Sequence, residues 1–179
     1  MHGIIFSEMK RYIDARLGAD GWNKALAVSG QTGKVFLATK VYPDEDAVDM
    51  IAAASRLTGL SVSAVLEDFG EFMAPSLLRV HRALVPKSWK TLDLIEHAES
   101  TIHTVVRSRT PGALPPVLQA RRVSPDEVQL TYASARRMCG MARGLARGLG
   151  KEFGEQIVVF ETACMLTGAP ACQITIRRL

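Results

Sequence analysis

Two histidines inside one predicted helix are the first residues whose side chains could do chemistry. His97 and His103 lie in the segment 89–116, where apolar residues recur near the helical period until Pro111 and Gly112 end the pattern. Six residues on a helix correspond to about 240° of rotation, so the two imidazoles cannot share one metal ion as an i, i+4 pair would. At most one of them is a ligand, and a lone histidine at the edge of an apolar face is usually a packed or surface residue.

A polar triplet follows in the stretch Y-x-S-x-R, formed by Tyr132, Ser134 and Arg136. We expect Tyr132 to end a strand, Ser134 to cap the next helix and Arg136 to lie in the first turn of that helix. All three side chains could then point at one acidic group, which a guanidinium binds bidentately. An isolated match to such a short pattern is usually coincidence, so its value depends on what accompanies it.

His103, the pair Pro115-Pro116 about a dozen residues further on, and the Y-x-S-x-R stretch together resemble the haem nitric-oxide/oxygen-binding family, H-NOX, a sensor module related to soluble guanylate cyclase. The resemblance runs from the N-terminal M-H-G-I-I-F to the C-M-L-T-G-A segment at 164–169, essentially the whole chain. It implies that His103 is the proximal ligand of a haem iron and that Tyr132, Ser134 and Arg136 bind the haem propionates. It also implies that Pro116 presses on the porphyrin and distorts it. With no C-x-x-C-H motif, the haem b would be held non-covalently.

The resemblance also assigns the residues that surround the bound gas. Ile5, Met9 and Met141 stand at such positions, and Met73 is a further candidate from the helix over 61–80, for which ordinary core packing is the alternative. All four are apolar, which disfavours oxygen. Family members that hold oxygen stably have a tyrosine where this chain has Met141, and a thioether gives a polar ligand no hydrogen bond. Nitric oxide bonds to ferrous iron without that help. We therefore expect an NO sensor, with CO as a second ligand, unless the hydroxyl of Tyr12 reaches the pocket.

Three cysteines form a second candidate site. Their odd number in a chain without a secretory leader argues against a disulfide framework. One branch of the resembling family binds a structural zinc through three cysteines at the positions of Cys139, Cys164 and Cys172, with a histidine where this chain has Glu161. A carboxylate can complete a tetrahedral zinc site, so zinc binding through Glu161 stays open beside free buried thiols or a thiol redox switch.

The surrounding pattern predicts an α+β fold with haem buried between two subdomains of a single domain, 1–179. Helices are expected over 3–17, 21–28, about 44–60, and 61–80 with Pro75 bending or dividing the last, which gives a helical distal subdomain over 1–85. Ser88 is expected to cap the His103 helix. Period-two alternation then predicts a hairpin at 116–132, a helix over 134–151, and two strands over 156–163 and 172–178. Residues 86–179 would thus form an antiparallel sheet with packed helices, carrying the haem ligand.

Composition and charge limit the other function classes. The chain is 47% hydrophobic in 179 residues, enough for a sizeable core, and we find neither a membrane-spanning apolar run nor a leader, so we expect a soluble cytoplasmic protein with no membrane association. The net charge of +4 is uneven, because residues 107–179 carry +6 and residues 1–106 carry −2. Its arginines are scattered without an aromatic platform or a DNA-binding motif, which disfavours a nucleic-acid partner.

By resemblance, NO would weaken or break the iron–His103 bond, the His103 helix would shift, and the haem would relax against Pro116. We find no catalytic pair of residues and expect no enzymatic activity. A chain of this length leaves no room for an output domain, so the partner would act in trans; in bacteria with this family it is usually a histidine kinase or a cyclic-di-GMP enzyme. The alternative is a cysteine or zinc redox sensor with a secondary or vestigial haem site.

Overall fold

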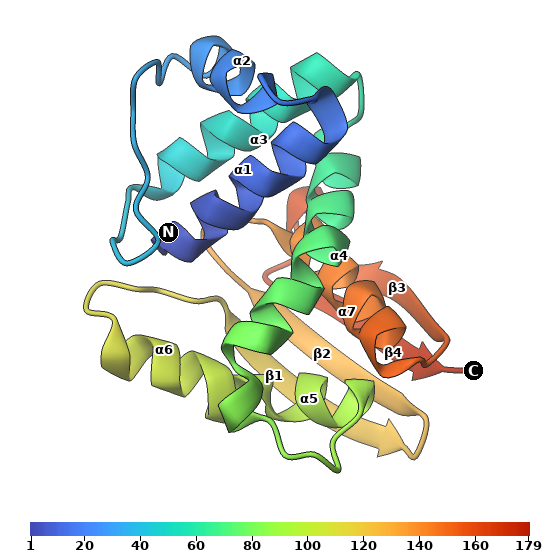
Figure 1. Cartoon of the computed structure of the whole chain (residues 1–179). Helices are drawn as coiled ribbons and strands as arrows, with labels where there is room; N and C mark the ends of the chain where they lie inside the picture. Colours follow the sequence, from blue (N-terminus) through green and yellow to red (C-terminus); the bar gives the residue numbers. More distant parts are fainter.

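The computed structural model describes residues 1–179 and has the α+β architecture expected from the sequence. Three helices gather at one end of the molecule: α1 (Gly3–Leu17), α2 (Gly21–Val28) and α3 (Asp44–Thr58). The long helix α4 (Val62–Val80) runs from them toward a four-stranded sheet (Figure 1). After the short 3-10 turn η1 (Arg82–Leu84), the helices α5 (Thr91–Ala98) and α6 (Thr104–Arg109) lie beside the sheet.

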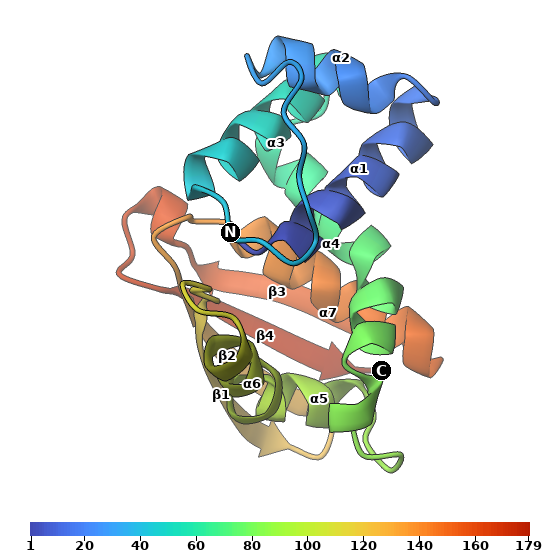
Figure 2. The same ribbon diagram turned by 60° about the vertical axis from the view of Figure 1, so that its left-hand side comes forward.

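The sheet is antiparallel throughout and has the order β1-β2-β4-β3. Two hairpins build it, β1 (Val117–Ser124) with β2 (Glu127–Ala133), and β3 (Ile157–Ala163) with β4 (Cys172–Arg178). A 3-10 turn η3 (Met165–Thr167) lies in the second hairpin. The sequence predicts both hairpins; the pairing of β2 with β4, which joins them, is a finding of the structure. Helices α5 and α7 (Cys139–Phe153) cover one face of the sheet (Figure 2).

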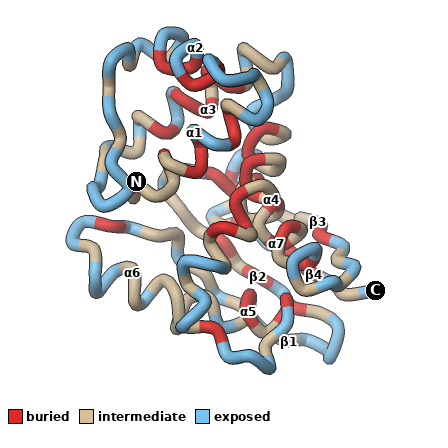
Figure 3. Tube along the Cα trace, viewed as in Figure 1, coloured by how far each residue is buried: buried red, intermediate tan, exposed pale blue.

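Apolar residues form two cores, visible as separate buried segments in Figure 3. The first lies among α1, α2, α3 and α4 and also takes in Met138. The second lies between the sheet and the helices α5 and α7. Helices α4 and α7 pack closely and connect the two cores. Glycine allows their approach: a Cβ built on Gly144 would lie 2.0 Å from the carbonyl oxygen of Glu67.

Three local predictions are corrected. The helix expected over 134–151 begins only at Cys139, because residues 134–138 turn, with the Arg137 amide donating to the Ser134 carbonyl and Arg137 at φ 53°. Ser134 therefore does not cap α7, and Arg136 does not lie in the first turn of that helix. The His103 helix begins at Thr91, after Lys90 rather than after Ser88, because the Asp93 carboxylate accepts the Lys90 amide. Of the two effects expected of Pro75, division of α4 is wrong, because the helix runs unbroken from Val62 to Val80, and a bend at Pro75 stays a prediction.

The helix that carries His103 is not continuous either. Between α5 and α6 the backbone widens into a π-helical turn, η2 (Glu99–His103). The amide of Thr104 reaches back five residues to the carbonyl of Glu99. Such wide turns inside helices occur often at functional sites. No single helix of the chain is long and apolar enough to cross a bilayer; α3 and α4 satisfy that test only together, across a bend of 105°.

Candidate functional site

His103 lies at the end of the wide turn, with its side chain 17% exposed. Its Nδ1 atom lies 3.0 Å from Oε2 of Glu99. Burial lowers the pKa of the imidazole below its usual range, and the neighbouring Glu99 carboxylate and the Pro116 carbonyl oppose that shift. The ring is therefore neutral at pH 7, the form in which histidine binds a metal. One nitrogen is engaged by the carboxylate, which leaves Nε2 for a ligand role.

The sequence analysis does not predict a contact between Glu99 and His103, although the two residues are four apart, a spacing that places side chains together on a helix. Its Oε2 also accepts the amide of Leu118 at 3.2 Å, and its Oε1 accepts the guanidinium of Arg107. Burial alone would raise the pKa of this carboxyl, but the hydrogen bonds from His103, Arg107 and Leu118 lower it overall. The carboxylate thus connects the His103 turn with β1, two residues after Pro116.

The Y-x-S-x-R residues lie where β2 turns toward α7. Tyr132 is buried at 2% exposure, and burial raises the pKa of its phenol, while a hydrogen bond with Ser134 works in the opposite direction. The guanidinium of Arg136 is 9% exposed. It donates to the Asp44 carboxylate at 3.1 Å and to the Leu114 carbonyl at 2.5 Å.

Asp44 is a second residue that the sequence did not reveal. It holds Arg136 and also accepts the Met1 amino group at 2.7 Å, so residues from both halves of the chain meet here. An open groove of about 260 Å³ is lined by this pair, and it also includes Glu45, Val48, Asp49 and Ala135. Arg136 donates to the carbonyl of Leu114, the residue before Pro115, and the carbonyl of Pro116 contacts His103. The proline pair thus connects the Arg136 site with the His103 turn.

The four residues expected around the gas belong to one apolar cluster. Met9 and Met73 are each 1% exposed in the first core, and Ile5 and Met141 pack against it. Met141 lies at the crossing of α4 and α7, where a Cβ on Gly70 would come within 2.3 Å of its carbonyl oxygen. The structure thus brings residues from α1, α4 and α7 together.

The hydroxyl of Tyr12 is already engaged. It donates to Oδ2 of Asp68 at 2.9 Å, and Arg16 pairs with the same carboxylate at 2.6 Å. The ring of Tyr12 packs against Phe69 and Phe72. Burial, together with the Asp68 carboxylate, raises the pKa of the phenol well above its usual range, so the group stays protonated as a donor to Asp68.

The cysteines form a compact cluster with Glu161. Cys139 begins α7, Glu161 lies on β3, Cys164 follows β3 and Cys172 begins β4, and one ligand atom from each lies within 4.8 Å of all the others. Sγ of Cys164 is 3.6 Å from Sγ of Cys139 and 3.8 Å from Sγ of Cys172. Arg143 donates to Oε2 of Glu161 at 2.6 Å, while the buried Oε1 has no hydrogen-bond partner.

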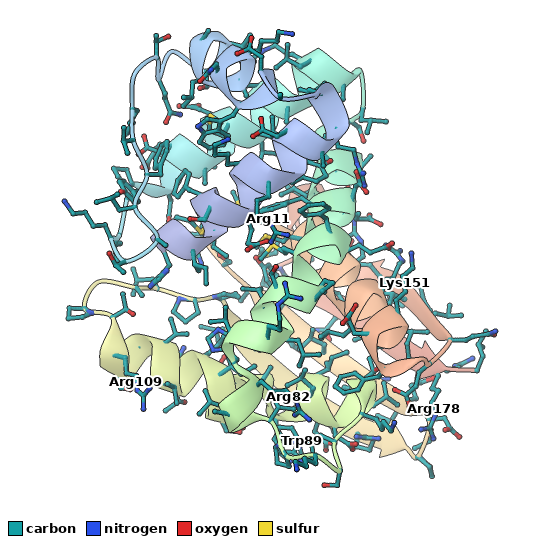
Figure 4. The ribbon with its side chains drawn as sticks, in the orientation of Figure 1. Arg11, Arg82, Trp89, Arg109, Lys151 and Arg178 are labelled. Atoms are coloured by element: carbon teal, nitrogen blue, oxygen red, sulfur yellow. The ribbon has the colours of Figure 1, made fainter.

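Basic residues of the C-terminal half are mostly used in internal ion pairs. Arg143 and Arg147 hold Glu67 on α4, and Arg178 holds Asp126 and Glu155. Lys151 pairs with Glu71 at the outer side of α7 (Figure 4). The positive charge of this half thus contributes to packing between elements.

The site thus combines a partly buried, neutral histidine near a proline pair, a phenol–hydroxyl–guanidinium cluster and an apolar cluster from three helices, which is the side-chain set that the resemblance to the H-NOX family implies. Comparison of the sequence with protein families agrees. A family profile described as haem-NO-binding (HNOB) matches residues 2–161. The chain belongs to this family, the H-NOX domains, a class of haem-based gas sensors.

Solved structures show the same fold. An H-NOX protein from S. oneidensis, in the Fe(II)NO state, is 25% identical, with a TM-score of 0.92 over 100% of this chain and 99% of that one. The Fe(II)CO form of a Shewanella oneidensis H-NOX domain is 25% identical, with a TM-score of 0.89 over 100% of this chain and 99% of its own. An oxygen-binding H-NOX domain related to soluble guanylate cyclases is 21% identical with a TM-score of 0.83, over 99% of this chain and 95% of that one, which shows the fold alone.

A curated relative is soluble guanylate cyclase 89Db of Drosophila melanogaster, 24% identical over 158 residues. The match covers 86% of this chain and 23% of the cyclase. Soluble guanylate cyclase 89Da of the same organism is 22% identical over 81% of this chain and 22% of that protein. The chain thus spans about a quarter of the length of these cyclases.

Proposed function

We propose that this domain binds haem b through His103 and senses nitric oxide. The observation that carries the proposal is the neutral imidazole of His103, engaged at Nδ1 by Glu99 and lying beside Pro116. When bound, haem supplies a ferrous iron with an open position for a diatomic gas. The residues present fit this group, because they offer one neutral imidazole, an anion-binding cluster and an apolar wall.

Within this proposal, Tyr132, Ser134 and Arg136 would bind the two propionates. Arg136 is held by Asp44 and by the Leu114 carbonyl, so its guanidinium is fixed before any ligand arrives. A fixed guanidinium loses little conformational entropy on binding a carboxylate. Pro116 would contact the porphyrin face next to His103. The division into a distal subdomain over 1–85 and a proximal one over 86–179 is part of the same proposal, and the two apolar cores support it.

The preference for NO rests on the distal wall. Met9, Met73 and Met141 carry no hydrogen-bond donor, and the hydroxyl of Tyr12, a residue of the same core, is bound to Asp68. Replacing Met141 by tyrosine tests this wall directly. We expect the reduced wild type to keep its spectrum in air and Met141→Tyr to change it reversibly, whereas a wild type that responds to air as the variant does would contradict NO selectivity.

We further propose that the chain has no catalytic activity of its own and regulates a histidine kinase or a cyclic-di-GMP enzyme in trans, from a cytoplasmic location. The test is kinase autophosphorylation, or cyclic-di-GMP turnover, with the reduced domain before and after NO. A His103→Gly variant is the matched control, since it removes the ligand through which the gas would signal. Equal regulation by wild type and variant would refute signalling through His103.

A structural zinc at the cysteine cluster is the last part of the proposal. A tetrahedral site with Zn–S bonds of about 2.3 Å has S···S edges of about 3.8 Å, close to the separations found between Cys164 and the other two sulfurs. The unpartnered Oε1 of Glu161 would be the fourth ligand. Burial raises the pKa of Cys139 and Cys172, so the thiols stay protonated until a cation replaces their protons. A haem-independent redox sensor is not favoured, because the matched family is haem-binding.

A further inference from the structure

The Glu99 carboxylate has a position that suggests a role in tuning the haem ligand rather than only in folding. It lies 3.0 Å from Nδ1 of His103, and both side chains are partly buried, Glu99 at 30% and His103 at 17% exposure. A hydrogen bond to an ionised acceptor is about twice as strong as one to a neutral acceptor, and low solvent access strengthens it further. A carboxylate behind a ligating histidine fixes its tautomer and raises its basicity.

Three donors hold Glu99 in place. The Leu118 amide at 3.2 Å shares Oε2 with His103, and Arg107 takes Oε1. The carboxylate therefore cannot rotate away from the imidazole without losing two other hydrogen bonds. The backbone contributes as well, since the wide turn η2 places Glu99 and His103 side by side and the hydroxyl of Thr104 donates to the Glu99 carbonyl at 3.0 Å.

Arg107 limits the effect of this carboxylate. Its guanidinium, 37% exposed, neutralises part of the negative charge that His103 would otherwise experience. The imidazole is thus polarised more than it would be by a backbone carbonyl, and less than it would be by an unpaired carboxylate. Glu99 and Arg107 act in opposite directions on the same ring.

We propose that Glu99 is a positioning residue that sets the donor strength of His103 and links its movement to β1. This inference rests on the proposed function, because it concerns the histidine that would bind iron. Greater electron donation at Nε2 strengthens the iron–histidine bond and favours the ferric state. Through the Leu118 amide, the same carboxylate connects the His103 turn to the strand that follows Pro116.

The test is the iron–histidine stretching frequency of the reduced haem-loaded protein, measured by resonance Raman, together with its midpoint potential. Glu99→Gln keeps the side-chain shape but removes the charge, so the frequency should fall and the potential should rise. Arg107→Gln removes the neutralising guanidinium and leaves the carboxylate to His103 and the Leu118 amide, so it should shift both quantities in the opposite direction. Glu96→Gln removes a carboxylate one turn earlier, bonded to Arg122, and should change neither.

The outcomes separate this inference from the proposed function. A wild type that takes up haem through His103, while Glu99→Gln and Arg107→Gln leave frequency and potential unchanged, overturns the role of Glu99 alone. Shifts of the same sign in both variants also overturn it, because a general loosening of the turn would produce them. A wild type that takes up no haem overturns the proposed function and this inference with it. Opposite shifts in the two variants, with Glu96→Gln unchanged, support the inference.

Discussion

Gly144 is the residue at which the approach of α4 to α7 is most sensitive to one added methyl group. A Cβ at this position would lie 2.0 Å from the Glu67 carbonyl oxygen, where ordinary contact begins at 3.4 Å, so the backbones would separate by 3.4 − 2.0 = 1.4 Å. Overpacking of a core typically costs about 1–3 kcal/mol, and a clash with backbone belongs at the upper end. Alanine is more stable than glycine inside a helix by about 1 kcal/mol, which offsets part of this cost. The expected net destabilisation for Gly144→Ala is therefore about 2 kcal/mol.

Thermal unfolding followed by circular dichroism measures this effect. For a chain of this size we expect the midpoint to fall by about 4–8 °C. Gly140→Ala is the matched control in the same helix, because its Cβ would meet Leu66 and Ser63 at 3.1 Å, where small shifts suffice. We expect that variant to stay within about 0.5 kcal/mol of wild type. A Gly144→Ala protein as stable as wild type would refute the close helix crossing as the junction of the two cores.

Three further predictions concern individual polar groups. Tyr12→Phe removes the hydrogen bond to Asp68 and should lower the unfolding free energy in urea by about 1–2 kcal/mol, while the spectrum in air stays that of wild type; a wild type that responds to air and a variant that has lost this response would mean that Tyr12 does reach the gas. Burial would raise the pKa of Glu67, but the hydrogen bonds from Arg143 and Arg147 lower that pKa overall. The ion pairs of Glu67 therefore stabilise the fold fully above the unfolded pKa of about 4.3. They lose that effect as the pH falls through the lower pKa of the folded state. Glu67→Gln should therefore reduce stability at neutral pH and flatten the acid decline of the melting temperature, and an unchanged acid decline would contradict the ion-pair account. We expect metal analysis to find zinc in the wild type and none in Cys172→Ser, and a wild type purified without zinc that also fails to bind added zinc would refute the cysteine site.

Regular elements were predictable because their signals are local. The helical period over 3–17 and the alternation that predicts both hairpins correspond to α1 and to the β1–β2 and β3–β4 pairs. Local signals do not indicate which strand of one hairpin pairs with which strand of the other. The pairing of β2 with β4 therefore emerged only from the structure.

Turns and tertiary partners explain the remaining differences. The segment 134–138 reads as helical, yet it turns at Arg137 while Arg136 bonds to Asp44, a residue 92 positions away. The wide turn at Glu99–His103 likewise has no local sequence signal, although the spacing of its two ionisable residues was visible. Family resemblance predicts the roles of His103 and the Y-x-S-x-R residues, which stay predictions, whereas the contacts of Glu99 and Asp44 emerged only from the structure.

The central question is whether the reduced protein takes up haem through His103 and distinguishes NO from oxygen. The most direct measurement is the absorption spectrum of the haem-loaded wild type, reduced without oxygen, then exposed separately to air and to NO, beside His103→Gly. We predict a five-coordinate ferrous spectrum that persists in air and shifts with NO to a form without the His103 bond. A protein that takes up no haem would contradict the proposal that this domain binds haem through His103. A reduced spectrum that changes stably in air as it does with NO would contradict the proposed preference for NO.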